Sequence, residues 1–256
     1  MAKVIAVTNQ KGGVGKTTTV VNMADVLQRK GFKVLLIDTD PQGNATDTYR
    51  AVIDGEATLY DLLFEDESPI DCIQHTAQGD IIAADPLLKG AEKKLSGVDG
   101  AYRLGERIEP LLPIYDYILI DTPPTLGVLL TNALTAANSI IVPVTADRYG
   151  IQGLAQLNET IASIKKYTNR NLIVEGLLLV KYNPRTNLSK ELYSSLCSIA
   201  ERFETVVFKT TIRESTKAKE AQTVRQSLFG YAPQCTTALD YGAFISELLE
   251  RMKKNG

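Results

Sequence analysis

The sequence predicts an α/β fold in which a doubly wound, mainly parallel sheet is flanked by helices. Three observations indicate this fold class. Short runs rich in Val, Ile and Leu alternate along the chain with segments of helical periodicity. The apolar runs are continuous rather than alternating, which is typical of strands buried on both faces. A glycine-rich segment, residues 9–19, joins the first apolar run to the first helical segment.

Seven apolar runs are predicted to be strands, and they cover residues 3–9, 33–38, 80–84, 117–121, 139–144, 174–180 and 205–209. Helical periodicity predicts helices over 16–30, 101–112, 153–166, 189–203 and 241–254. Residues 46–69 carry short helical pieces and turn signals, so we expect a surface elaboration beside the first crossover. Alternation of strands and helices predicts right-handed crossovers.

The composition is that of a globular protein with a full core: 44% of the 256 residues are apolar and 23% are charged. No Pro/Gly/Ser-rich linker divides the chain, so we expect one domain over residues 1–256. The chain has neither an apolar run long enough for a membrane span nor the features of a signal peptide. Three scattered cysteines and the single His75 match neither a disulfide framework nor a zinc site. We therefore expect a cytoplasmic protein.

The glycine-rich segment predicts a phosphate-binding loop. Gly12, Gly13 and Gly15 permit positive φ and close approach of the backbone, so that consecutive N–H groups can point at phosphate oxygens. The N-terminus of the helix that begins near Lys16 adds a partial positive charge. Lys16 should reach the β- and γ-phosphates, and the Thr17 hydroxyl should ligate Mg²⁺. The expected nucleotide contacts in this segment are Lys11, Gly12, Gly13, Val14, Gly15, Lys16, Thr17 and Thr18.

One departure from the usual phosphate-loop pattern is informative. Gln10 stands where a glycine is usual, and a second lysine, Lys11, lies beside it. A further cation is not needed to bind a single nucleotide. We therefore expect Lys11 to act in trans on the nucleotide of a second copy across a dimer interface. A solvent-facing lysine is the alternative interpretation.

Three carboxylates are expected at the carboxyl ends of predicted strands, where open α/β sheets bind their ligands. Asp121 follows a hydrophobic strand and matches an acid that reaches Mg²⁺ through water. Asp38 and Asp40 follow another strand, two residues apart. One of them would hold the metal's water shell, here assigned to Asp38, and the other, Asp40, would orient the attacking water. A helix N-cap or a turn former is the alternative role for each acid.

These motifs resemble those of the ParA/MinD family of deviant Walker ATPases. KGGVGKTTT (11–19) resembles the family's Walker A motif, in which Lys11 is the signature lysine, and DTDPQGNAT (38–46) resembles its second motif. YILIDTPP (117–124) resembles its Walker B motif. The similarity extends over nearly the whole chain and is closest to the ParA, or Soj-like, partition branch.

The resemblance implies a P-loop NTPase fold, weak Mg²⁺-dependent ATPase activity and a homodimer that sandwiches ATP. In that dimer Lys11 contacts the partner's nucleotide, Lys16 contacts the bound phosphates, and Asp40 positions the hydrolytic water. The dimer then binds DNA without sequence preference and associates with the nucleoid, and a ParB-like adaptor stimulates hydrolysis. The resemblance places adenine contacts at Asn183 and around Pro233.

The net charge of -2 conceals an uneven distribution. Residues 1–150 hold 13 basic and 20 acidic residues, whereas residues 151–256 hold 15 and 10. A basic half can neutralise DNA phosphates, and a dimer presents two such patches. A solvated mixed-charge face is the alternative. The expected phosphate contacts are Arg213, Lys217 and Lys219, although Soj-like members carry arginine at the position of Lys217 and proline after the isoleucine at 212.

Other functions share part of this pattern. In a MinD-like regulator of cell division, residues 244–254 would lie on a membrane surface, but the same spacing suits a last helix packed on the sheet. We expect no stable membrane association. An iron–sulfur reductase is excluded because the cysteines match no cluster pattern. A ParA-like ATPase that positions a non-DNA cargo, or a nucleotide-gated regulator, remains open.

Overall fold

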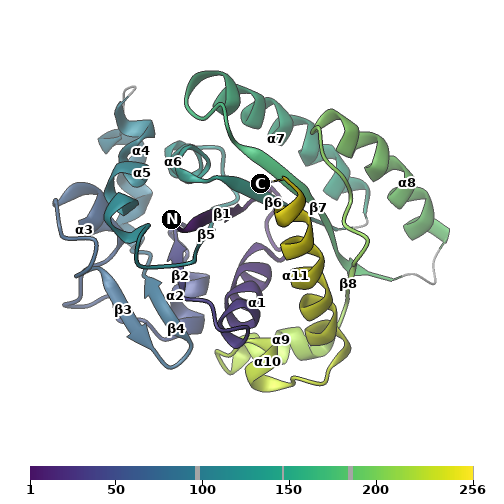
Figure 1. The fold of residues 1–256 in the computed structure, drawn as a ribbon, viewed down its shortest axis with the longest axis horizontal. Helices are drawn as coiled ribbons and strands as arrows, with labels where there is room; N and C mark the ends of the chain where they lie inside the picture. Colours follow the sequence, from purple (N-terminus) through teal and green to yellow (C-terminus); the bar gives the residue numbers. More distant parts are fainter. Residues whose placement is uncertain (96–98, 146, 184–186, 256) are drawn as a thin grey trace.

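The computed structural model describes residues 1–95, 99–145, 147–183 and 187–255. One eight-stranded sheet runs through it in the order β3-β4-β2-β5-β1-β6-β7-β8 (Figure 1). Neighbouring strands are parallel except β3 and β4, which form an antiparallel hairpin at one edge. The predicted fold class is therefore confirmed. The single sheet supports the expectation of one domain, which stays a prediction.

The strands are β1 (Lys3–Val7), β2 (Val34–Asp38), β3 (Ile73–Thr76), β4 (Gly79–Ile82), β5 (Tyr117–Asp121), β6 (Ser139–Thr145), β7 (Ile173–Tyr182) and β8 (Ile212–Arg213). The longer helices are α1 (Lys16–Arg29), α6 (Val128–Ala136), α7 (Arg148–Tyr167), α8 (Asn187–Arg202), α9 (Thr216–Thr223) and α11 (Thr236–Asn255). Short helices are α2 (Asn44–Tyr49), α3 (Leu59–Phe64), α4 (Ala91–Lys94), α5 (Arg103–Ile108) and α10 (Leu228–Tyr231).

Two hydrophobic cores lie on opposite faces of the sheet. Helices α3 to α8 contribute to one core, and α1, α2, α9, α10 and α11 contribute to the other. Along β2, Leu35 and Ile37 point into the first core and Val34 and Leu36 into the second. Burial on both faces explains why the strand runs are continuously apolar.

The strand predicted over residues 205–209 is wrong. Only an isolated bridge between Val207 and Leu177 forms there, and the edge position beside the end of β7 is taken by the short β8. The hairpin strand β3 was not predicted, because its Gln74 and His75 are polar and lie at the sheet edge. Helical periodicity in the sequence also did not predict α6 and α9.

The last helix, α11, packs against α1 on the sheet (Figure 1). Phe244, Ile245 and Leu248 are buried in the core, and Leu249 and Met252 are partly buried against it. The apolar face that a membrane-surface helix would need is therefore used for packing. Among the described residues, no helix has the length and apolar character required to cross a bilayer.

Candidate functional site

The phosphate loop, residues 9–15, connects β1 to α1 with the backbone conformation that its glycines allow. Gly13 and Gly15 have φ values of 69° and 95°, in the left-handed region that favours glycine. Asn9 is buried and braces the loop, because its Oδ1 accepts from the Lys11 N–H at 2.9 Å and its Nδ2 donates to the Pro143 carbonyl at 2.7 Å. The Asn9 side chain thus connects the loop to β6. The sequence motifs did not identify this residue.

Lys16 and Thr17 begin α1 directly beneath the loop. The Lys16 side chain is nearly buried, and this burial lowers its pKa, while the negative charges of Asp121 and Asp40 act in the opposite direction. The Thr17 hydroxyl donates to Asp121 Oδ2 at 2.6 Å. The Lys16 ammonium group thus lies at the base of the loop, where burial and the two carboxylates have opposite effects on its charged form.

Asp121 shows the chemistry expected of a group that receives a cation. It is fully buried, and burial together with the charge of Asp38 raises its pKa well above the usual range. Its Oδ1 has no hydrogen-bond partner within the described part of the chain. An orphaned buried oxygen beside the Thr17 hydroxyl fits the water shell of a Mg²⁺ ion. No group of three or more His, Cys, Asp or Glu side chains that could hold a metal occurs among the described residues.

Asp38 and Asp40 have different surroundings although they lie two residues apart. Asp38 is buried and organises the following loop: its oxygens accept from the Asp40 N–H at 3.1 Å and from the N–H and hydroxyl of Thr46, both at 2.9 Å. Burial raises the pKa of Asp38 to about 6. Asp40 faces the cavity described next, whereas Asp38 does not line it. Asp38 thus anchors the following loop, as the turn-forming alternative expects, and its place in the metal's water shell stays a prediction.

A cavity of about 570 Å³, here called the main cavity, opens at the carboxyl end of the sheet. Residues 12–18 line it from the phosphate loop and α1, Asp40 lines it from the end of β2, and Lys181 lines it from the end of β7. Gln222 reaches it from α9 and donates from Nε2 to the Thr18 hydroxyl at 2.8 Å. The volume of the main cavity falls in the usual range for small-molecule sites.

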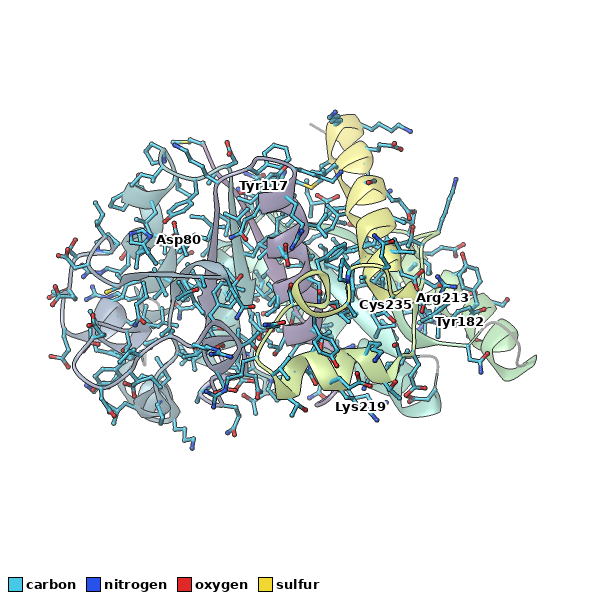
Figure 2. All side chains as sticks on the ribbon, turned by 90° about the horizontal axis from the view of Figure 1, so that it is seen from below. Asp80, Tyr117, Tyr182, Arg213, Lys219 and Cys235 are labelled. Carbon is cyan, nitrogen blue, oxygen red and sulfur yellow. The ribbon has the colours of Figure 1, made fainter. Side chains whose placement is uncertain are left out.

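A second cavity of about 510 Å³, here called the side cavity, lies between the end of β7 and the start of α9. Tyr182, Arg213 and Lys219 are among its lining residues (Figure 2). Asn183, one of the two expected adenine contacts, lines this cavity as well. Pro233, the other, is exposed and lines neither cavity. Of the two expected adenine contacts, Asn183 alone therefore lines one of these two cavities, and both contacts stay a prediction.

The three expected DNA contacts occur near each other around β8 and α9 but differ in their partners. Arg213 is clasped by Asp240 of α11, with its Nε and one terminal nitrogen 2.9 and 2.6 Å from the two carboxylate oxygens. Lys217 pairs with Glu220 at 2.7 Å and lies over the ring of Tyr231. Lys219 forms no ion pair with another described residue and lines both cavities.

Lys11 is also paired within its own chain. Its Nζ lies 3.0 Å from the Thr145 hydroxyl and 2.8 and 2.7 Å from the two carboxylate oxygens of Asp147. Both side chains remain partly exposed, at 29% and 42%. The pair therefore holds Lys11 at the surface, and separating it costs little.

Besides Asn9, three residues of the site were missed by reasoning from the sequence. Lys181 follows a predicted strand, so the strand-end rule applied to the aspartates would have found it. Asp147 follows another strand, β6, and offered the same signal. Gln222 had no such signal, since its contact with Thr18 depends on how α9 packs against the phosphate loop.

Comparisons with known proteins agree with this geometry. A family model described as an AAA domain matches residues 2–174. The sporulation initiation inhibitor protein Soj of Bacillus subtilis is 40% identical over 245 residues, covering 94% of this chain and 96% of Soj. The chromosome-partitioning ATPase Soj of Thermus thermophilus is 36% identical over 251 residues, covering 98% and 96%.

Among solved structures, cobyrinic acid a,c-diamide synthase of Mycobacterium smegmatis, with a bound ATP analogue and magnesium, superposes with a TM-score of 0.85. It is 32% identical, and the match covers 100% of this chain and 98% of that one. The phosphate loop, the strand-end carboxylates and near full-length relatives lead to one conclusion. The chain belongs to the ParA/Soj family of deviant Walker ATPases.

Proposed function

We propose that this protein is a DNA-partition ATPase, which binds Mg²⁺ and ATP in the main cavity and uses them to control dimerisation and DNA binding. The observation that carries the proposal is the contact of Thr17 with Asp121 beneath the phosphate loop, next to the nearly buried Lys16. Relatives named as chromosome-partitioning proteins cover nearly the whole chain and support the cellular role.

Each residue of the main cavity has a distinct task in this proposal. Lys16 neutralises the β- and γ-phosphates, and the loop amides from Gly12 to Thr18 bind their oxygens. Thr17 and Asp121 would hold a Mg²⁺ ion, which would neutralise charge on the phosphates. Asp40 orients the attacking water, since its carboxylate faces the cavity. Asp38 supports this arrangement through the Thr46 loop; direct participation in the metal's water shell stays a prediction.

Lys11 provides the link between nucleotide and dimer. We propose that it leaves Asp147 and contacts the phosphates of the partner's ATP, which completes the site in trans. An exposed ion pair contributes at most about 1 kcal/mol, so charged phosphate outcompetes Asp147 once ATP is bound. ADP offers one phosphate fewer, and the dimer should therefore depend on ATP.

DNA binding follows from dimerisation in the same proposal. Two copies of the basic segment around α9 neutralise phosphates together, and affinity rises steeply with the number of phosphates neutralised. We propose that Arg213, Lys217 and Lys219 make these contacts, and Arg213 also contacts α11 through Asp240. A ParB-like adaptor would stimulate hydrolysis and release the DNA, and the nucleoid-associated state is the ATP dimer.

The adenine base is proposed to lie near Asn183 in the side cavity.

The proposal is tested by the oligomeric state of Asp40→Ala with different nucleotides. Because this change removes the group that orients water, ATP should persist and trap a dimer in size-exclusion chromatography with light scattering. The same variant with ADP should be a monomer, and Asp40→Ala combined with Lys11→Ala should stay monomeric with ATP. A monomer of Asp40→Ala in saturating ATP contradicts the sandwich dimer.

A further inference from the structure

We propose that Lys181 is a nucleotide-positioning residue, which holds the phosphate loop in its binding conformation through the carbonyl of Gly13. The proposal rests on the proposed nucleotide site. Lys181 Nζ donates to the Gly13 carbonyl oxygen at 2.7 Å, although the two residues are 168 positions apart in the chain. This contact ties the end of β7 directly to the loop that would wrap the phosphates.

The backbone of β7 is distorted at this residue. The pairing with β8 shifts register between Val180 and Tyr182, so Lys181 is the extra residue of a bulge. Its φ is 53°, in the left-handed region that lysine seldom adopts. Bulges re-aim side chains next to functional sites, and uncommon backbone conformations persist where their surroundings hold them. The distortion turns Lys181 toward the phosphate loop.

Fixing the Gly13 carbonyl has a consequence for the next amide. In a trans peptide unit the carbonyl oxygen and the following N–H point in opposite directions, and no cis peptide bond occurs in the part of the chain that the structure describes. Lys181 therefore sets the direction of the Val14 N–H, one of the amides proposed to bind phosphate oxygens. With φ of 69°, Gly13 itself could adopt other orientations readily.

Lys181 also occupies a junction in the site. It lines the main cavity, whereas the next two residues, Tyr182 and Asn183, line the side cavity. Its ammonium group, which donates to the Gly13 carbonyl, adds positive charge beside the phosphate loop. One side chain thus connects loop geometry, charge and the two cavities.

The test compares Lys181→Met with Lys89→Met, which removes the same charge from an exposed lysine outside both cavities. Dissociation constants for Mg-ADP and Mg-ATP are measured by titration calorimetry on the full chain. Loss of a charged hydrogen bond should raise both constants roughly tenfold in Lys181→Met. The unfolding temperature without nucleotide should stay unchanged, and Lys89→Met should bind as the parent does.

Lys181→Asn gives a second variant that accepts the left-handed backbone but lacks the amine, and it should lose the same affinity. Lys181→Arg should retain most of it, because a cation remains. Parent-like affinity of Lys181→Met and Lys181→Asn overturns the inference, as does an arginine variant as weak as either. If Lys16→Ala abolishes binding while Lys181→Met does not, the proposed function stands and this inference fails. If Lys16→Ala binds normally, the proposed site itself fails.

Discussion

At the scale of single residues, Lys16 places a nearly buried positive charge at the proposed nucleotide site. Its ammonium group is nearly buried, and its pKa is lowered by that burial, with Asp121 and Asp40 opposing the shift. A charge in such a place is retained because neighbouring carboxylates balance it, and bound phosphates would balance it further.

Replacing Lys16 with alanine should abolish measurable ATP binding, because the field on the phosphates is lost. The loss should be at least roughly 100-fold in the dissociation constant, measured by calorimetry with Mg-ATP. Lys30→Ala, at the exposed C-terminal end of α1, is the matched control and should bind as the parent does. Retained affinity in Lys16→Ala removes the phosphate-loop assignment.

The pair formed by Lys11 and Asp147 gives a second residue-scale prediction. Asp147→Asn should free Lys11 and lower the ATP-dependent dimer dissociation constant by up to about fivefold, the equivalent of about 1 kcal/mol. The measurement is a dilution series by light scattering in the Asp40→Ala background. Asp66→Asn, which removes another exposed acid paired with Arg103, should have no effect. Weaker dimerisation in Asp147→Asn would show that Asp147 serves the dimer rather than the monomer.

At the scale of elements, α9 lies between the main cavity, which its Gln222 lines, and the surface that carries its Lys217. Gln222 contacts Thr18 from one side of the helix, whereas Lys217 engages Glu220 and Tyr231 on the exposed surface. The N-terminus of α9 is capped by Ser215, whose hydroxyl accepts from the Lys217 N–H at 3.1 Å. This cap stabilises the first turn of α9, from which Lys217 and Lys219 extend.

Charge reversal on α9 should remove DNA binding without changing nucleotide affinity. The variant is Lys217→Glu with Lys219→Glu; Arg213 is left in place because it clasps α11 through Asp240. DNA retention is measured by filter binding with ATP over a salt series, and lost phosphate contacts should also flatten the salt dependence, by roughly one unit of slope for each contact. The control reverses the exposed Lys253 and Lys254 at the end of α11. Unchanged retention at moderate salt would locate the DNA surface elsewhere.

The packing of α11 gives a prediction about stability. Phe244 is fully buried and meets Phe208 edge to face, with ring centroids 5.0 Å apart. Phe244→Ala should lower the free energy of unfolding by about 3–5 kcal/mol, measured by urea denaturation. Leu239→Ala, on the same helix but 52% exposed, should change it by less than about 0.5 kcal/mol. Equal effects would mean that α11 is not docked as described, and would revive a membrane-surface role for it.

At the scale of the whole molecule, three carboxylates, Asp38, Asp40 and Asp121, gather at the carboxyl end of one sheet beside the single ammonium group of Lys16. Asp38 and Asp121 are register partners on the adjacent strands β2 and β5, and burial raises the pKa of each. Mg²⁺ and ATP relieve this desolvated charge, so their binding should be coupled to global stability.

Mg-ATP should therefore raise the melting temperature of the chain. At a concentration 100 times the dissociation constant, linkage gives about 2.7 kcal/mol, or roughly 5–10 °C for a chain of this size. Differential scanning fluorimetry with ATP alone, with Mg-ATP and with Mg-ATP plus EDTA separates the metal from the nucleotide. Most of the shift should disappear with EDTA, and Lys16→Ala should show none. An equal shift in EDTA would exclude a metal role for Thr17 and Asp121.

The sequence by itself determined the fold class and the composition of the phosphate site. Both follow from short-range patterns: buried parallel strands must be continuously apolar, and a phosphate loop must have glycines immediately before the helix that carries Lys16 and Thr17. The strand-end rule likewise found Asp121, because a carboxylate after an apolar run lies at the ligand-binding edge. These features need only neighbouring residues to be recognised.

Only the tertiary structure decided which residues meet across long separations. It showed that Asp38 accepts hydrogen bonds from Thr46, that Asn183 lines the side cavity, and that Arg213 is held by Asp240. It also replaced the strand predicted over residues 205–209 by β8, since edge pairing depends on chain geometry as well as on apolar character. The net charge of -2 shows the same limit, because a sum over the sequence cannot say which charges are paired and which face a ligand.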